Sequence, residues 1–465
     1  MERERLGSRL GFILLSAGCA IGVGNVWKFP WMAGQYGGGA FVLVYLIFLV
    51  IIGLPVMLME FSLGRASQSS VAGLYQKLEK PGQKWHYHGY MALAANVLLV
   101  MFYTSVAGWI LYYFVSFLAG NMTGLTDEQS GALFGNMLSS PLITVGFMAI
   151  VVVMGFLTLS FGLQKGVERI TKYMMIVLLL LMIVLAVHGF TLSGAGEALS
   201  FYLKPDISKI NGNVIVAAMN QSFFTLSLGI GSMAIFGSYI GKERSLTGES
   251  VNILLLDTFV AVVAGLVIFP ACFTFDIEPS SGPSLLFVAL AKVFNEMPGG
   301  RWWGAVFFLF MFFAAMSTVI AVFENILACV REIKGWGRLK GCLICGIVIF
   351  ILSVPCALGF NVWSSFKPFT SNSSILDLED FIVTNCMLPL GSLCFVLFCI
   401  SKKGWGFDNF MAEVNTGKGI KISKWMKPYM TYVLPIMIII IFIIGIMTFE
   451  FSDGFTIWGW LKELL

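Results

Sequence analysis

Long apolar segments, separated by short polar connections, follow one another along almost the whole chain. Each is about 18 residues or longer, enough for an α-helix to cross the ~30 Å hydrocarbon core of a membrane. The pattern predicts eleven membrane helices, at 11–34, 39–62, 88–119, 141–160, 166–189, 212–240, 251–275, 301–331, 341–359, 376–400 and 428–449. We therefore expect an all-α membrane protein, with residues 1–465 forming a single domain.

Composition and charge place this chain in a lipid bilayer and orient it. The sequence is 58% hydrophobic and 12% charged, which leaves no stretch for a soluble domain. With the amino terminus in the cytoplasm, about 22 of the 29 Lys and Arg residues fall on cytoplasmic segments. The start has no small-residue cleavage site and is not a signal peptide. These features predict a multi-pass protein of the inner (plasma) membrane with a cytoplasmic amino terminus and an extracytoplasmic carboxyl terminus.

Glycines interrupt the first and the sixth predicted helices. The first contains Gly18, Gly22 and Gly24, and the sixth contains Gly229 and Gly231. Glycine weakens a helix and frees backbone groups, although glycines also allow two helices to pack closely. Because the interrupted helices stand five helices apart, we favour the interpretation that both are broken near the middle of the membrane.

Matched breaks five helices apart are typical of transporters built from two inverted repeats. The first repeat would cover 11–189 and the second 212–400, and 428–449 would add an eleventh helix. In such folds the substrate and the coupling ion bind where the broken helices meet. The pattern thus predicts a binding site at the centre of the protein.

The break in the first helix offers ligands for charges of both signs. Freed carbonyls at Gly18, Ala20 and Ile21 are hard oxygen ligands for a small cation, whereas freed N–H groups at Val23 and Gly24 can hold a carboxylate. A backbone group left unsatisfied in hydrocarbon costs several kcal/mol. The break therefore requires partners.

Asp257 lies in the middle of the seventh predicted helix, where a carboxylate costs roughly 2.5–3.5 kcal/mol on insertion scales. Lys28 is the only basic residue that we expect at a comparable depth. A bound cation or a proton is thus the favoured counter-charge, and a purely structural carboxylate is the alternative. Glu60 and Glu324 lie close to helix ends, so ion binding and the capping of free amides are equally open for them.

A face of the eighth predicted helix carries Ala314, Ser317 and Thr318 at positions i, i+3 and i+4. One carbonyl and two hydroxyls on one face can complete a cation site. Hydroxyls in membrane helices also bond back to the preceding turn, and from this pattern alone that alternative is slightly favoured.

Enzymatic functions lack support in the sequence. The histidines are His86, His88 and His188, and they do not form the spacing of a metal or catalytic site. The sequence has no phosphate-binding loop, which argues against ATP-driven transport. Its nine cysteines lie mostly in apolar segments and predict neither a disulfide nor a zinc site. We expect no enzyme activity and no nucleic-acid partner.

Several motifs closely resemble those of the neurotransmitter:sodium symporter family, in particular its bacterial amino-acid transporters. They are GVGNVWKFP at 22–30, GGGAF at 37–41, EFSLGR at 60–65, KGVER at 165–169 and FFTLSLG at 223–229. The resemblance extends over nearly the whole chain. It implies a leucine-transporter-type fold and sodium-coupled amino-acid symport by alternating access.

The resemblance also implies roles for individual residues. One sodium ion would be held by Ala20, Asn25, Thr225 and Asp257, and a second by Gly18, Ile21, Ala314, Ser317 and Thr318. The substrate would contact Cys19, Ala20, Val23, Gly24, Leu99, Tyr103, Phe224, Thr225, Ser227, Ile230, Thr318 and Val322. Outer and inner gates would be formed by the pairs Lys28–Asp380 and Arg3–Glu332.

The chain departs from the family pattern at three gate-related positions. Lys28 replaces a common arginine and loses its bidentate geometry, Leu6 replaces a common tryptophan, and Ile176 replaces a proline of helix 5. Without that proline, unwinding of helix 5 during inward sodium release is in question.

The apolar residues of the implied pocket favour an apolar or aromatic amino acid as substrate. Chloride-dependent members of the family have Asn and Ser where this chain has Asp257 and Ala261, so we expect transport to be independent of chloride. The alternative function is an amino-acid receptor or sensor that does not transport. An ion channel would need a continuous polar stripe, which the sequence lacks.

Overall fold

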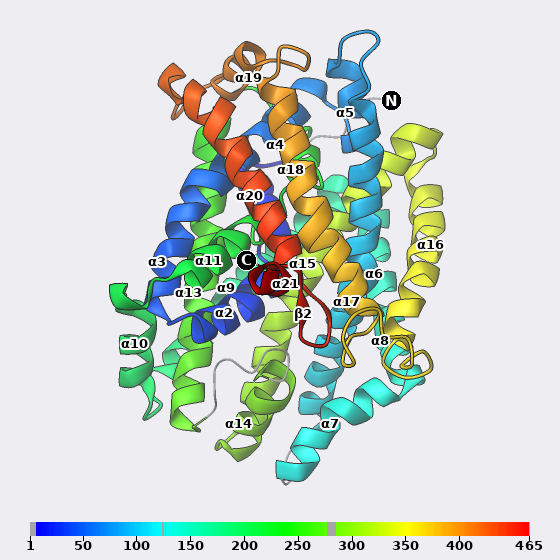
Figure 1. Ribbon diagram of the computed structural model, residues 1–465. Helices are drawn as coiled ribbons and strands as arrows, with labels where there is room; N and C mark the ends of the chain where they lie inside the picture. The colour runs from blue at the N-terminus through cyan, green and yellow to red at the C-terminus, as the bar shows by residue number, and fades with distance from the viewer. Residues whose placement is uncertain (1–5, 123–124, 126, 277–284, 465) are drawn as a thin grey trace.

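The computed structural model describes residues 6–122, 125, 127–276 and 285–464. It is a bundle of helices whose long members run roughly side by side (Figure 1). All eleven predicted segments contain helix. The all-α prediction is therefore confirmed.

Within the described residues, the first half of the chain forms twelve helices. They are α1 (Arg9–Ala20), α2 (Phe29–Gln35), α3 (Gly39–Phe48), α4 (Leu54–Ser67), α5 (Val71–Leu78), α6 (His86–Ala119), α7 (Asp127–Ser139), α8 (Pro141–Ser160), α9 (Arg169–Gly189), α10 (Ala195–Leu203), α11 (Gly212–Phe224) and α12 (Ser232–Gly237). Short π-helical turns join several of them, at η1 (Gly24–Lys28), η2 (Leu49–Gly53) and η3 (Leu163–Glu168). The 3₁₀ turn η4 (Ile207–Lys209) precedes α11.

The second half adds nine helices and a short hairpin. The helices are α13 (Leu246–Thr274), α14 (Leu290–Glu296), α15 (Gly300–Lys334), α16 (Arg338–Leu358), α17 (Ile375–Asp380), α18 (Leu388–Ile400), α19 (Phe407–Val414), α20 (Leu434–Met447) and α21 (Ile457–Leu464). Between them lie η5 (Leu285–Ala289), η6 (Phe381–Met387), η7 (Lys424–Met426) and η8 (Tyr429–Val433). The strands β1 (Glu450–Ser452) and β2 (Phe455–Thr456) pair antiparallel.

Both predicted helix breaks are present. In the described part of the chain, nine helices are each long and apolar enough to span a membrane, and α1 with η1 and α2 forms a further span bent by 58°. The sixth predicted helix is divided into α11 and α12 by residues 225–231. There Ser227, Gly229 and Gly231 have φ values of 50°, 94° and 75°. This left-handed backbone ends α11 and explains the glycines.

Helix α15 forms the centre of the bundle. In its most apolar stretch 83% of the residues are buried, compared with 33% in the spans Leu163–Gly189 and Lys424–Met447. It packs against α6, α9, α8 and α1. The side chains on α15 that face α1 are thus held by the most buried of the described membrane spans, which favours a rigid site.

Helix α9 runs without interruption through Ile176, as expected for a helix that lacks the proline. The irregular backbone lies earlier, at Gly162, whose φ is 94°, and in the π-helical turn η3.

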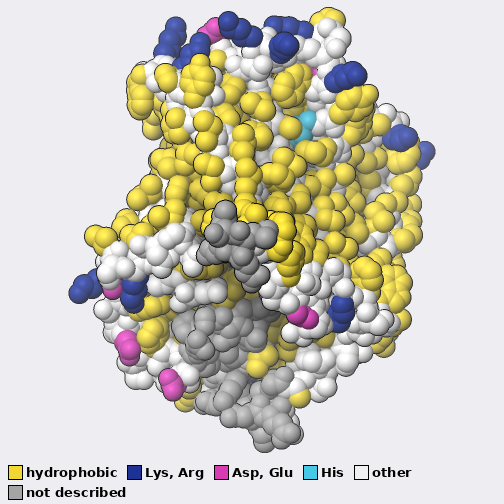
Figure 2. Space-filling model, in the orientation of Figure 1, with side chains coloured by type: hydrophobic (Ala, Val, Ile, Leu, Met, Phe, Trp, Pro, Cys, Tyr) yellow, Lys and Arg dark blue, Asp and Glu magenta, His cyan; other side chains and the backbone are white. Residues whose placement is uncertain are grey.

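Charged and apolar side chains separate on the surface. Figure 2 shows Lys and Arg side chains gathered at the top, around the region labelled α19 in Figure 1, above a broad apolar belt. Exposed apolar residues of the belt include Val153, Leu157, Leu180 and Ile351. Such a belt matches the hydrocarbon of a membrane, with one positively charged end.

At this positively charged end, a buried arginine of α4 binds the segment that follows α18. Arg65 of α4 is fully buried, and its Nε lies 2.6 Å from Glu413 Oε1 of α19. Its Nη1 donates to the carbonyl of Arg244 at 2.8 Å, and its Nη2 donates to the carbonyl of Glu413. Three separate segments therefore meet at one guanidinium.

We predict that Arg65→Ala lowers the free energy of unfolding by about 3–5 kcal/mol, because it leaves Glu413 and two carbonyls buried without their donor. Thermal denaturation of the purified protein in detergent measures the change. The control is Lys242→Ala. The Lys242 side chain is 62% exposed and its Nζ lies 3.5 Å from Glu413 Oε2, so this change should alter stability by less than about 1 kcal/mol. Equal effects of the two substitutions would contradict the proposed importance of the buried guanidinium.

Candidate functional site

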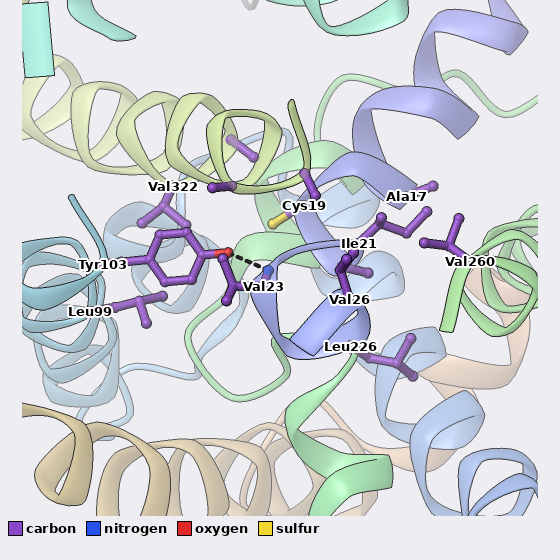
Figure 3. Close-up of a cluster of buried hydrophobic side chains, with 14 of the residues drawn as sticks. Ala17, Cys19, Ile21, Val23, Val26, Leu99, Tyr103, Leu226, Val260 and Val322 are labelled. Atoms are coloured by element: carbon purple, nitrogen blue, oxygen red, sulfur yellow. Dashed lines mark hydrogen bonds between the residues drawn. The ribbon is translucent and has the colours of Figure 1, made fainter. Parts of the chain in front are cut away.

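The break in the first helix lies against Tyr103 of α6. Helix α1 ends at Ala20, and the next residue, Ile21, is extended. The Val23 N–H, freed by this break, donates to the Tyr103 hydroxyl at 2.9 Å (Figure 3). The break thus has one of the partners that its position in the membrane requires.

A polar cluster joins both helix breaks to α13. The Asn25 amide donates to Asp257 Oδ1 at 2.8 Å and to Thr225 Oγ1 at 3.0 Å. The Thr225 hydroxyl donates to Asp257 Oδ2 at 3.2 Å. These three side chains, at most 2% exposed, come from positions that the resemblance assigned to the first sodium site. With Ala20 beside them in the cavity wall, the structure brings that predicted set together.

The Asp257 carboxylate is fully buried, and within the described residues it takes part in no ion pair. A buried carboxylate without a positive partner is costly, even when an amide and a hydroxyl donate to it. Its surroundings offer oxygen atoms rather than basic groups. The chemistry of the cluster therefore suits a small cation.

A second group of oxygen atoms lies between α1 and α15. The Thr318 hydroxyl lies 3.3 Å from the Gly18 carbonyl and 3.5 Å from the Ile21 carbonyl. The Ser317 hydroxyl lies 3.4 Å from the Ile21 carbonyl and 3.0 Å from the Ala314 carbonyl. Thr318 thus faces the broken helix instead of its own preceding turn, whereas Ser317 does both.

These spacings fit a hard cation. Oxygen ligands at about 2.4 Å from an ion and at right angles lie about 3.4 Å apart. Both hydroxyls and the carbonyls of Gly18 and Ile21 meet this spacing, and they are buried. Direct hydrogen bonds would be shorter, since O–H···O distances cluster near 2.7–2.8 Å.

A small cavity of about 30 Å³ adjoins the first cluster. It is lined by Cys19, Ala20, Gly22, Gly24, Asn25, Leu99, Tyr103, Phe224, Thr225, Ser227, Ile230, Thr318 and Leu388. Ten of the twelve residues predicted to contact the substrate are in this wall. Val23 and Val322 are not, although both lie beside Tyr103 in Figure 3.

Leu388 is the wall residue that the sequence did not indicate. It begins α18 after the π-helical turn η6, and no spacing or charge distinguishes it from neighbouring apolar residues. Its position follows only from how α18 packs against the broken sixth helix. The Leu388 carbonyl lies so close to Gly229 that no side chain fits there.

Gly22 and Gly24 keep the cavity open. A Cβ atom at Gly22 would lie 2.5 Å from the Tyr103 hydroxyl and 2.7 Å from Thr318 Oγ1. A Cβ atom at Gly24 would lie 2.8 Å from the Phe224 ring. Any side chain at these positions would displace the groups that form the wall.

Phe224 separates the cavity from a wider outer vestibule of about 220 Å³. The vestibule is lined by residues from both broken helices, η6, α18 and α20. The Lys28 ammonium lies 4.0 Å from the centre of the Phe224 ring, a cation–π contact. Lys28 and Phe224 together cover the site from this side.

The predicted Lys28–Asp380 pair is not formed among the described residues. Asp380 instead accepts a hydrogen bond of 2.7 Å from the Thr384 hydroxyl, one turn later. The physical reason is that the Lys28 ammonium instead lies over the Phe224 ring, and both residues line the vestibule. That Lys28 and Asp380 pair to form the outer gate in a more closed conformation stays a prediction.

At the end of the protein opposite the vestibule, two carboxylates that the sequence did not indicate bind the start of α1. Glu168 accepts from the Gly7 N–H at 2.7 Å and from the Ser8 hydroxyl at 2.8 Å. Arg9 lies 2.9 Å from Glu249 of α13. Motifs alone could not indicate these contacts, because they join segments about 160 and 240 residues apart.

The predicted inner-gate residue Glu332 accepts a hydrogen bond of 2.8 Å from the Ser70 N–H. Its predicted partner Arg3 lies outside the described residues. Leu6, which stands at the family's tryptophan position, packs against the apolar core.

The remaining intramembrane carboxylates have structural partners. Glu60 accepts from the Gly229 N–H at 2.6 Å and so satisfies an amide freed by the break in the sixth helix. Glu324 lies 2.5 Å from Arg338 and also accepts from the Tyr239 hydroxyl at 2.9 Å. These contacts favour the capping and structural alternatives for both residues.

Comparison with known proteins agrees with this architecture. The sequence profile of the sodium:neurotransmitter symporter family matches residues 3–127 and 137–461. The chain is 35% identical to the sodium-dependent transporter YhdH of Bacillus subtilis, over 95% of this chain and 98% of YhdH. It is 26% identical to a sodium-dependent serotonin transporter of Drosophila melanogaster, over 96% of this chain and 77% of that protein.

Among solved structures, the chain resembles MhsT in complex with L-phenylalanine. The TM-score is 0.85 at 36% identity, over 96% of this chain and all of that one. This likeness confirms the predicted leucine-transporter-type fold. The match over almost the whole length shows the family: this chain belongs to the sodium:neurotransmitter symporter family, a family of sodium-dependent secondary transporters and not of enzymes.

Proposed function

We propose that this protein is a symporter that couples uptake of an apolar or aromatic L-amino acid to sodium by alternating access. The observation that carries the proposal is the buried Asp257 carboxylate beside the cavity at the two broken helices. Its neighbours carry oxygen atoms, and no basic group within the described part of the chain pairs with it. The related MhsT has been solved with L-phenylalanine bound, which supports an amino-acid substrate.

Two sodium ions would occupy the two oxygen clusters. The first would lie against Asp257, Asn25 and Thr225, and the substrate carboxylate would complete its shell. The second would lie between the α1 carbonyls and the hydroxyls of Ser317 and Thr318. Since both clusters include backbone of the same broken helix, ion binding would stabilise one arrangement of that helix and couple the ions to the substrate.

The cavity wall supports recognition of both ends of an amino acid. The Tyr103 hydroxyl and the freed amides of the first helix can donate to a carboxylate. Leu99, Ile230 and Leu388 offer apolar surface for the side chain. Gly22 has no side chain, so this position offers no carboxylate that could pair with the amine of a monoamine substrate.

We also propose that the end carrying α19 and the amino terminus faces the cytoplasm. This assignment follows from the Lys and Arg side chains that gather there. The vestibule beside Lys28 then opens to the outside. The carboxyl-terminal hairpin, whose Asp453 accepts from the Ser371 N–H at 3.0 Å, lies on the outer half.

A competition assay tests the substrate class. We expect L-phenylalanine, tryptophan or leucine to displace labelled L-phenylalanine from the purified protein in sodium buffer, and binding to fall in choline buffer. Lysine, glutamate and serotonin should compete at least about tenfold less well, because the cavity offers no fixed partner for their charges. Equal competition by serotonin would contradict an amino-acid site.

The second sodium site is tested by Ser317→Ala/Thr318→Ala. The sodium concentration for half-maximal substrate binding should rise by about tenfold or more, because each lost ligand oxygen is worth roughly 1.5 kcal/mol. The matched control is Thr158→Ala, whose hydroxyl bonds back to the Met154 carbonyl at 2.9 Å, away from the site. Unchanged sodium dependence in a folded double variant would favour a merely structural role.

We further propose that transport does not require chloride, because Asp257 supplies a fixed negative charge beside the first sodium ion. Two sodium ions and a zwitterionic substrate bring net positive charge into a buried site, and one carboxylate offsets part of it. Chloride-dependent relatives of the family have Asn and Ser at the positions of Asp257 and Ala261. Ala261 has no side-chain donor for an anion.

Exchanging these two residues tests the chloride hypothesis. Asp257→Asn alone should reduce uptake by at least about tenfold, because the site loses the fixed negative charge of this carboxylate. Asp257→Asn/Ala261→Ser should recover part of the uptake when chloride is present. Uptake in chloride and gluconate buffers provides the comparison. Strong chloride stimulation of the unchanged protein would refute the proposal.

A further inference from the structure

A row of lysines lies in the connection that leads into the last membrane helix. Residues 418–427, here called the basic segment, include Lys418, Lys421, Lys424 and Lys427, and all four are exposed. They follow one another at every third position. In the described part of the chain, no carboxylate forms an ion pair with any of them. Their charges are therefore available to a partner outside the protein.

The basic segment also presents apolar side chains at the edge of the hydrocarbon belt. Trp425 is 75% exposed and Ile420 is 59% exposed. The apolar span Lys424–Met447 begins within the segment. Tryptophan beside lysine at the start of a membrane helix is typical of the headgroup region of a bilayer.

The folded protein holds this segment in place. The Lys418 N–H donates to the Glu243 carbonyl at 2.9 Å, and the Ser245 N–H donates to the Lys418 carbonyl at 3.0 Å. The Asn415 side chain bonds both the N–H and the carbonyl of Ile422, at 2.7 and 2.9 Å. The lysines are thus presented on a fixed backbone, which reduces the entropy lost when a partner binds.

From this arrangement we infer that the basic segment binds the phosphate headgroups of anionic phospholipids in the adjacent leaflet. Four ammonium groups, none of them in an ion pair among the described residues, supply charge complementarity at the depth of the headgroups, and Trp425 and Ile420 supply contact with the acyl-chain boundary. Clusters of four or more basic residues next to a membrane helix suffice for such recognition. The inference rests on the proposed membrane placement of α20, but not on sodium coupling or on the substrate.

Quenching of Trp425 fluorescence by brominated lipids tests the inference. The full-length protein is reconstituted in phosphatidylcholine with a small fraction of brominated phosphatidylglycerol or brominated phosphatidylcholine. The difference between the unchanged protein and Trp425→Phe isolates Trp425 from the other tryptophans. We expect the binding constant for phosphatidylglycerol to be about tenfold higher than that for phosphatidylcholine, and this ratio to fall in high salt.

Charge-removal variants complete the test. Replacing all four lysines by Gln should bring the two lipids to nearly equal quenching, and Lys421→Gln/Lys424→Gln, which leaves the Lys427–Phe407 contact intact, should give an intermediate preference. The control replaces Lys80, Lys84, Lys402 and Lys403 by Gln, which removes the same charge elsewhere, and should keep the preference. Inorganic phosphate at millimolar concentration should not abolish it.

Equal quenching of Trp425 by the two lipids in the unchanged protein would overturn the inference. So would an undiminished preference in both lysine variants, or its complete loss in millimolar phosphate. None of these readouts depends on substrate binding, so a failure here is distinguishable from a failure of the proposed transport function.

Discussion

The need to satisfy unwound backbone and a buried carboxylate in a low-dielectric interior governs this structure. The first helix stops at Ala20 and the sixth is broken at 225–231, both next to Asp257. Protein groups satisfy some of these backbone amides. The Tyr103 hydroxyl accepts a hydrogen bond from the Val23 N–H, and the Glu60 carboxylate accepts one from the Gly229 N–H. The oxygen atoms that remain form two clusters whose spacing and charge suit small cations.

The surroundings of these clusters divide into a fixed part and parts that can move. Helix α15, the most buried of the described membrane spans, supplies Ser317 and Thr318 from a rigid support. At its charged end, the broken first helix is held by contacts with Glu168 and Glu249, and the Arg9 side chain in the second contact is 47% exposed. Such contacts can open at modest cost. A fixed helix facing a releasable one is the arrangement that alternating access requires.

Hydrophobic periodicity and matched glycines were sufficient to predict the membrane helices and the two breaks. Asp257 could be singled out because a carboxylate in an apolar helix is rare. In contrast, Leu388 in the cavity wall, Glu168 and Glu249 at the start of α1, and the Arg65–Glu413 pair were not predicted. These contacts join segments far apart in sequence, so they depend on tertiary packing that no local pattern encodes. The Lys28–Phe224 contact shows the same limit, since the family resemblance implied Asp380 as the partner.

A symporter and an amino-acid sensor would share this pocket, and only movement of substrate separates them. The direct measurement is uptake of labelled L-phenylalanine into proteoliposomes that carry an inward sodium gradient, compared with vesicles in which sodium is equal on both sides. The account predicts transient accumulation above the external concentration with the gradient, and its collapse when a sodium ionophore is added. Sodium-dependent binding without accumulation, or accumulation that persists without a sodium gradient, would contradict it.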